Sequence, residues 1–141
     1  MARYRTSVST PLSPDEAFAY MADVTRFTEW DGNVKSSRRV AGDGPGLGAS
    51  YDLDVGSTVM RYVVTHYSAP KRMVIEARTT FLTSVDEVTV EANAEGSVVT
   101  YDAVLTLNGP LALFDLALGI AFRRLGDAAA AGLRRVLKAS K

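Results

Sequence analysis

The sequence of 141 residues predicts an α+β fold in which a seven-stranded antiparallel sheet curves around one long C-terminal helix. Three observations lead to this prediction. A helix start signal follows the first strand-like segment. Between residues 34 and 107, apolar side chains recur at every second position in short segments separated by turn sequences. The last part of the chain carries apolar residues at spacings of three and four. Because no repeat or linker-like stretch divides the chain, we expect residues 1–141 to form a single domain.

The first strand and two short helices come before the main run of strands. Residues 3–10 alternate in polarity, which predicts a strand. The segment Ser13–Glu16 then offers an N-cap serine, a proline at the first helical position and a glutamate that completes a capping box. A second short helix is expected from Thr25 to Trp30, and Asp31-Gly32-Asn33 ends it.

Six further strands are expected from the period-two pattern. They are Val34 to Val40, Tyr51 to Val55, Val59 to Tyr67, Met73 to Arg78, a strand through Glu87 to Ala92, and Val99 to Leu107. Short turns join these strands, so they form an antiparallel meander. Each strand has one apolar face, and the sheet therefore needs a single cover.

The C-terminal segment supplies that cover. Asn108-Gly109-Pro110 ends the sheet, and a helix of about 28 residues is expected to follow. Its apolar stripe is Leu111, Phe114, Leu118, Phe122, Leu125, Ala129, Leu133 and Val136. The stripe is required against the sheet, which disfavours a membrane-binding role for it. No segment has the ~20 apolar residues of a membrane span, so stable membrane insertion is not expected.

A curved sheet wrapped round one helix seldom fills the space between them, so we expect a cavity there. The two short helices would close one end of it. Trp30, the only tryptophan, lies where the second of these helices ends. We therefore expect its ring to point inward at the rim of the cavity.

Composition excludes several classes of function. The formal net charge is zero, which argues against nucleic acid as a partner. The chain has no cysteine and a single histidine, His66, too few ligands for an ordinary transition-metal site, and no cofactor is expected. The first residues lack the apolar run of a signal peptide, which favours a cytoplasmic protein. A monomer and a homodimer are both compatible with the sequence.

The order and spacing of four segments resemble the START and Bet v 1-like (SRPBCC) superfamily, whose architecture is called the helix-grip fold. The segments are "SPDEAFAYMADVTRFTEW", "GDGPGLGASYDL", "RYVVTHYSAPKR" and "LTLNGPLALFDLALGIAFRR". Within the superfamily, the bacterial polyketide cyclase/dehydrase-like group is the most similar. The resemblance implies a cavity for an apolar or aromatic molecule between sheet and C-terminal helix. The fold itself carries binders, transfer proteins and enzymes alike.

In aromatase/cyclase members of that group, the strand matching residues 59–67 points aromatic and polar side chains into the cavity. By alternation, the inward positions here are Met60, Tyr62, Val64 and His66. The relatives place a tryptophan at the position of Tyr62 and a catalytic arginine at that of His66. The present sequence departs from the pattern at both positions.

Inward parity and the resemblance together define the candidate ligand-binding residues. They are Trp30, Tyr51, Leu53, Met60, Tyr62, Val64, Met73, Ile75, Val88, Tyr101, Phe114, Leu118 and Phe122. The candidate catalytic residues are His66, Tyr62 and Asp86. Val88 and Val90 are expected to face inward, and alternation extended backwards along the strand turns Asp86 inward as well. A β-bulge would instead shift the register and expose Asp86 to water. His66 precedes a turn, where a rim position or a purely structural role is an alternative to acid-base chemistry.

Two functions from different classes follow. The first is binding of a small hydrophobic or aromatic molecule, such as a lipid, a polyketide or an isoprenoid-like compound. The alternative is a cyclase/dehydratase-type enzyme, in which Tyr62, His66 or Asp86 assists enolisation and loss of water.

Overall fold

The computed structural model describes the backbone of residues 1–108 and 115–139, with side chains described to residue 108 and again from Gly119. The elements in chain order are β1 (Ala2–Thr10), α1 (Pro14–Ala22), the 3-10 helix η1 (Val24–Glu29), β2 (Ser36–Ala41), β3 (Ser50–Asp54), β4 (Val59–Ser68), β5 (Arg72–Arg78), β6 (Leu82–Ala92), β7 (Ser97–Leu107) and α2 (Asp115–Ala139). The start of the predicted last helix, with Leu111 and Phe114 of its stripe, lies outside the described residues.

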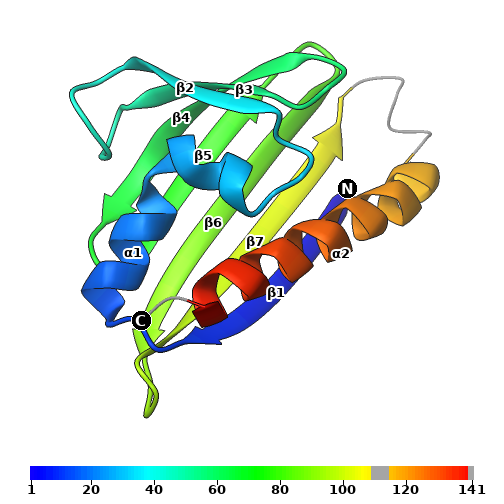
Figure 1. The fold of residues 1–141 in the computed structure, drawn as a ribbon. Helices are drawn as coiled ribbons and strands as arrows, with labels where there is room; N and C mark the ends of the chain where they lie inside the picture. Colours follow the sequence, from blue (N-terminus) through cyan, green and yellow to red (C-terminus); the bar gives the residue numbers. More distant parts are fainter. Residues whose placement is uncertain (109–114, 140–141) are drawn as a thin grey trace.

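The seven strands form one antiparallel sheet in the order β1-β7-β6-β5-β4-β3-β2. The sheet curves, and α1, η1 and α2 all lie on the same side of it (Figure 1). This arrangement confirms the predicted fold: a curved seven-stranded sheet with one long C-terminal helix and two short helices after the first strand. In the described part of the chain, no helix is both long enough and apolar enough to cross a membrane.

The sequence signals that predicted the two short helices, a capping box for the first and an end near Trp30 for the second, are confirmed. The Ser13 hydroxyl accepts a hydrogen bond from the backbone N–H of Glu16, and the Glu16 carboxylate accepts one from the N–H of Ser13, both at 3.2 Å. This reciprocal capping box satisfies two N–H groups that the helix leaves unpaired. The second helix is a 3-10 helix with Trp30 as its C-cap, and the Trp30 N–H donates to the carbonyl of Phe27.

One strand breaks the alternation on which the inward assignments rest. The β4–β5 pairing shifts register between Val64 and His66, so Thr65 is an extra residue. As a result Tyr67 faces the inner side, where it packs edge-to-face on Phe18 with ring centroids 5.5 Å apart. The prediction that His66 points inward is therefore wrong: the bulge places it, exposed, on the outer face.

Helix α2 packs most closely through its C-terminal half. Leu133 and Leu137 are fully buried, and the Thr10 hydroxyl donates to the Leu137 carbonyl at 2.7 Å. A Cβ added at Gly132 would lie 1.9 Å from the carbonyl oxygen of Trp30. Only glycine allows the helix backbone this close to the end of η1. Leu125, by contrast, is 48% exposed although the sequence placed it on the buried stripe.

Replacing Gly132 by alanine tests this close approach. The added methyl group must displace the Trp30 backbone, so Gly132→Ala should lower the free energy of unfolding by about 1–3 kcal/mol or more. Gly119→Ala is the matched control on the same helix, because in the described part of the chain no atom beyond its own stretch of the helix lies within 4 Å of its Cβ position. That change should raise helix stability by up to about 1 kcal/mol. Urea denaturation followed by circular dichroism measures both, and equal stability of the two variants would contradict the packing.

Candidate functional site

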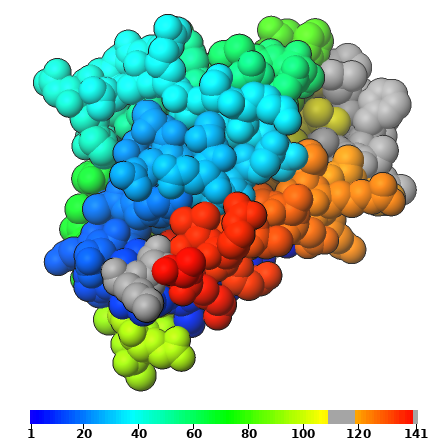
Figure 2. All heavy atoms as spheres, viewed as in Figure 1, coloured from blue at the N-terminus to red at the C-terminus, as the bar shows by residue number. Residues whose placement is uncertain are grey.

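A cavity of about 340 Å³ lies between the sheet, the end of η1 and α2. Its wall is mostly apolar. The lining residues are Tyr4, Thr6, Phe27, Trp30, Asp31, Asn33, Val34, Leu53, Val55, Ser57, Thr58, Met60, Tyr62, Leu82, Ser84, Asp86, Tyr101, Ala103, Leu105, Phe122, Leu125, Gly126, Ala129, Ala130 and Leu133. The segment after η1 (cyan) and α2 (orange to red) meet over the sheet in Figure 2. Of the lining residues, Thr58 is exposed and Leu125 is half-exposed. The mouth of the cavity therefore lies between the β3–β4 turn and α2.

The structure divides the predicted site residues into three groups. Six of the predicted ligand-binding residues line the cavity: Trp30, Leu53, Met60, Tyr62, Tyr101 and Phe122. Five others are buried in the packed core and do not line it: Tyr51, Val64, Met73, Ile75 and Val88. Phe114 lies outside the described residues, as does the side chain of Leu118. Of the predicted catalytic residues, Tyr62 and Asp86 line the cavity and His66 does not.

Trp30 forms the aromatic end of the cavity. Its side chain is 3% exposed and lies 4.9 Å from Phe27 and 5.2 Å from Tyr101, measured between ring centroids. The Tyr101 ring stands edge-on to both, a preferred arrangement of aromatic rings. Trp30 therefore occupies the inward position expected for it, although it is enclosed rather than at an open rim.

The polar side chains of the cavity form a hydrogen-bond chain that ends on one carboxylate. Tyr62 donates from its hydroxyl to the Ser84 hydroxyl at 2.9 Å, and Ser84 donates to Asp86 Oδ1 at 3.3 Å. The Tyr101 hydroxyl donates to Asp86 Oδ2. All three hydroxyl protons point toward Asp86, which is consistent with an ionised carboxylate.

Sheet geometry explains how this chain of hydrogen bonds forms. Ser84 and Asp86 are two residues apart on β6 and so share a face. Tyr62 reaches Ser84 across β5, because the residue between them in the register is the small Ala77. Tyr101 is opposite Val88, one inward position along from Asp86, which places its hydroxyl diagonally over the carboxylate. The pairing of β6 with β7 is uninterrupted, so no bulge turns Asp86 outward.

Burial dominates the electrostatics of these groups. It raises the pKa of Asp86 to about 6, although the hydrogen bonds from Tyr101 and Ser84 act in the opposite direction. Burial, reinforced by the charge of Asp86, also raises the pKa of Tyr62 and of Tyr101 above the ordinary value of a tyrosine. Both tyrosines therefore remain protonated donors at neutral pH.

A second carboxylate, Asp31, lines the cavity, a role that no pattern along the chain indicates. It follows η1 and accepts two hydrogen bonds from Asn33, through the backbone N–H and Nδ2, both at 3.0 Å. Burial raises the pKa of Asp31. Asn33 also donates from Nδ2 to the Leu125 carbonyl of α2 at 3.3 Å. The position of Asp31 thus depends on how η1 meets α2, which spacing along the chain does not reveal.

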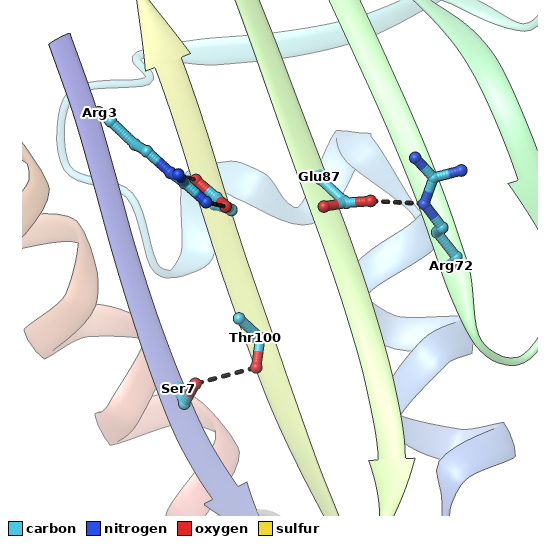
Figure 3. A network of polar contacts seen from close by, with 6 residues as sticks. Arg3, Ser7, Arg72, Glu87 and Thr100 are labelled. Atoms are coloured by element: carbon cyan, nitrogen blue, oxygen red, sulfur yellow. Dashed lines mark hydrogen bonds and ion pairs between the residues drawn. The ribbon is translucent and has the colours of Figure 1, made fainter.

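The outer face of the sheet carries a separate set of polar contacts. Arg3 donates to both oxygens of Asp102, at 3.0 and 2.6 Å, and Arg72 pairs with Glu87 (Figure 3). His66 lies in a shallow groove on this face with these residues. Within the described part of the chain, no group of three or more His, Cys, Asp or Glu residues could hold a metal ion.

The sequence model of one protein family matches residues 1–138. The chain belongs to this family, which is described as polyketide cyclase/dehydrase and lipid transport. Among curated proteins, no sequence matches significantly. The family supports a ligand-binding role.

Solved structures share the fold at low sequence identity. A START superfamily protein from Mycobacterium smegmatis has a TM-score of 0.77 at 12% identity, covering 97% of each chain. A hypothetical protein from Helicobacter pylori has a TM-score of 0.76 at 10% identity, covering 97% of this chain and 87% of its own. The di-domain ARO/CYC protein StfQ of the steffimycin biosynthetic pathway has a TM-score of 0.74 at 18% identity, over 98% of this chain and 49% of its own. The chain thus spans about half the length of StfQ.

The raised pKa of Asp86 predicts how stability depends on pH. Its pKa is about 6 in the folded protein and near 4 in the unfolded chain. The folded state therefore binds the Asp86 proton more tightly, so this group favours folding below pH ~4 and loses that contribution as the pH rises through ~6. Asp86→Asn should be more stable relative to the wild type at pH 7.5 than at pH 4, by on the order of 2 kcal/mol. Urea denaturation at both pH values measures this difference, and an unchanged difference would contradict the buried, ionisable Asp86.

Proposed function

We propose that the protein binds a small hydrophobic or aromatic molecule in the cavity between the sheet and α2. The observation that carries this proposal is the cavity itself. It is about 340 Å³ in volume, walled mainly by aliphatic and aromatic side chains, with a few convergent polar groups. These are the usual properties of ligand sites, whose volumes run from about 300 to 1,000 Å³. The volume is at the small end of that range and favours a compact ligand, and the family description, which includes lipid transport, agrees with a carrier.

The fluorescence of Trp30 tests binding directly. Because Trp30 is the only tryptophan and lines the cavity, its emission reports on this site alone. Titration with fatty acids, sterols, flavonoids and aromatic polyketides should give a saturable change with micromolar affinity for at least one class.

A pair of variants shows whether the ligand occupies the cavity. Ala103→Phe fills the cavity from β7 and should weaken binding about tenfold or more, since the ligand loses the space it occupies. Val104→Phe is the control: it adds the same ring on the outer face of the same strand. Both variants should keep the wild-type circular dichroism spectrum. Equal binding by Ala103→Phe and Val104→Phe would mean that the ligand lies elsewhere.

A second candidate function is a dehydratase or cyclase-type enzyme, which the position of Asp86 favours. The carboxylate takes a proton from the carbon next to a ketone of the bound substrate, and the electron pair of the C–H bond forms an enolate. The enolate then expels a β-hydroxyl group, to which Asp86 returns the proton, so that water and an unsaturated ketone leave. A base with a pKa of about 6 is ionised at neutral pH yet basic enough to accept a proton.

Turnover of a β-hydroxy ketone substrate tests this alternative. Asp86→Asn should abolish dehydration, a loss of about 100-fold or more, while leaving binding within a few-fold of the wild type. His66→Ala should retain full activity, because His66 lies on the outer face. Product formation is followed by the absorbance of the conjugated ketone. Unchanged turnover in Asp86→Asn would remove Asp86 from the mechanism.

A further inference from the structure

The cavity combines two carboxylates with aromatic walls and contains no positive side chain among the described residues that line it. Asp31 and Asp86 are both partly accessible in it, while six of the lining residues are aromatic: Tyr4, Phe27, Trp30, Tyr62, Tyr101 and Phe122. A carboxylate held in apolar surroundings is costly unless a positive charge or hydrogen-bond donors compensate it. Hydrogen bonds from neighbouring side chains and from the Asn33 backbone N–H compensate these two carboxylates only in part.

The hydrogen-bonding capacity that remains on Tyr62, Ser84, Asp86 and Tyr101 consists of acceptors, and the Trp30 indole N–H is the unpaired donor nearby. Tyr62 donates a hydrogen bond to Ser84, Ser84 donates to Asp86 Oδ1, and Tyr101 donates to Asp86 Oδ2. With these protons committed, the oxygens of the chain retain only lone pairs for a ligand. A ligand group that donates hydrogen bonds is therefore favoured here, and a ligand carboxylate would meet acceptors of the same charge.

Asp31 adds to the same preference. Its Oδ1 accepts both hydrogen bonds from Asn33, and Asn33 gives its other amide proton to Leu125. The charge of Asp31 acts in the same direction as burial and makes the ionised form of Asp86 harder to maintain. A positive charge beside Asp86 would oppose this effect.

The aromatic residues suit the same ligand. The faces of Trp, Tyr and Phe rings attract cations, and this attraction is strongest where water is excluded. The buried rings of Phe27 and Trp30 pack against Tyr101, whose hydroxyl lies on the Asp86 carboxylate. Carboxylate and aromatic cluster are thus neighbours at one end of the cavity.

Resting on the proposed binding function, we infer that the ligand is an apolar molecule carrying a protonated amine, which pairs with Asp86 inside the aromatic cavity. The apolar part of the ligand packs against the aliphatic wall formed by residues such as Leu53, Met60 and Leu105. Fatty acids and other anionic lipids are excluded by charge.

Three probes share one apolar skeleton and differ in the charge of a single group, so they distinguish the contribution of charge to the affinity from that of apolar contact. They are 1-adamantylmethylamine, 1-adamantylmethanol and 1-adamantanecarboxylate. All are compact and transparent where Trp30 is excited, so its emission follows each titration at pH 7.5. The amine should bind at least tenfold more tightly than the alcohol, because a charge-assisted hydrogen bond is worth a factor of roughly ten to a hundred in affinity. The carboxylate should bind more weakly than both.

Variants assign the preference to the carboxylates. Asp86→Asn should remove most of the amine's advantage and change the alcohol's affinity much less than the amine's, and Asp31→Asn, as a second independent variant, should reduce that advantage in the same direction. Asp102→Asn is the matched control, since Asp102 lies on the outer face in a pair with Arg3. It should leave all three affinities as in the wild type.

The outcomes separate this inference from the proposed function. Equal binding of amine and alcohol, or preferred binding of the carboxylate, would overturn the inference and leave cavity binding intact. An amine preference that survives in both Asp86→Asn and Asp31→Asn would also overturn it. If none of the three probes binds, the inference is overturned, and the titration of Trp30 with the wider panel still decides the proposed cavity binding.

Discussion

The close contact between α2 and the end of η1 is the constraint on which the cavity depends. Gly132 brings the helix backbone against the carbonyl of Trp30, and the Thr10 hydroxyl holds the Leu137 carbonyl nearby. These contacts fix the C-terminal half of α2 onto the sheet, where Leu133 and Leu137 are fully buried. Near the middle of the helix Gly126 lies against the Tyr4 ring, while Leu125 is 48% exposed and lines the cavity. The space between helix and sheet is therefore closed at one end and opens toward the β3–β4 turn, so the cavity follows from where the helix can approach closely.

Strand alternation explains both the placement of Asp86 and the failure to place His66. On β6 the register with β7 continues without a shift, and alternation extended backwards from Val88 turns Asp86 inward. On β4 a bulge at Thr65 exchanges the two faces beyond Val64, so His66 turns outward and Tyr67 inward. The sequence around Thr65 contains no glycine or proline that would mark a bulge. The same rule was therefore right on β6 and wrong on β4, and only the pairing of each strand with β5 distinguishes them.

The order of elements, the capping box at Ser13 and the inward position of Trp30 could all be predicted, because each depends on local sequence or on period. The extent of the cavity could not. Met60 and Tyr62 line it, whereas Val64, on the same face of the same strand, is packed in the core. Alternation identifies the face of a strand but not how deeply that face is covered, which depends on where α1 and α2 pack across the sheet. The role of Asp31 was missed for the same reason: it arises from a contact between distant segments.

The chemistry of Asp86 connects the two functional proposals. As the partner of a protonated amine, the carboxylate must stay ionised and paired, and the ligand recovers part of the free energy lost by burying it. As a catalytic base, it must be free to accept a proton from carbon, which a bound cation next to it would oppose by lowering its pKa. The same carboxylate cannot serve both roles in one complex. The charge of the natural ligand therefore decides between them: a cationic ligand makes the cavity a binding site, and a neutral β-hydroxy ketone leaves Asp86 available for proton transfer.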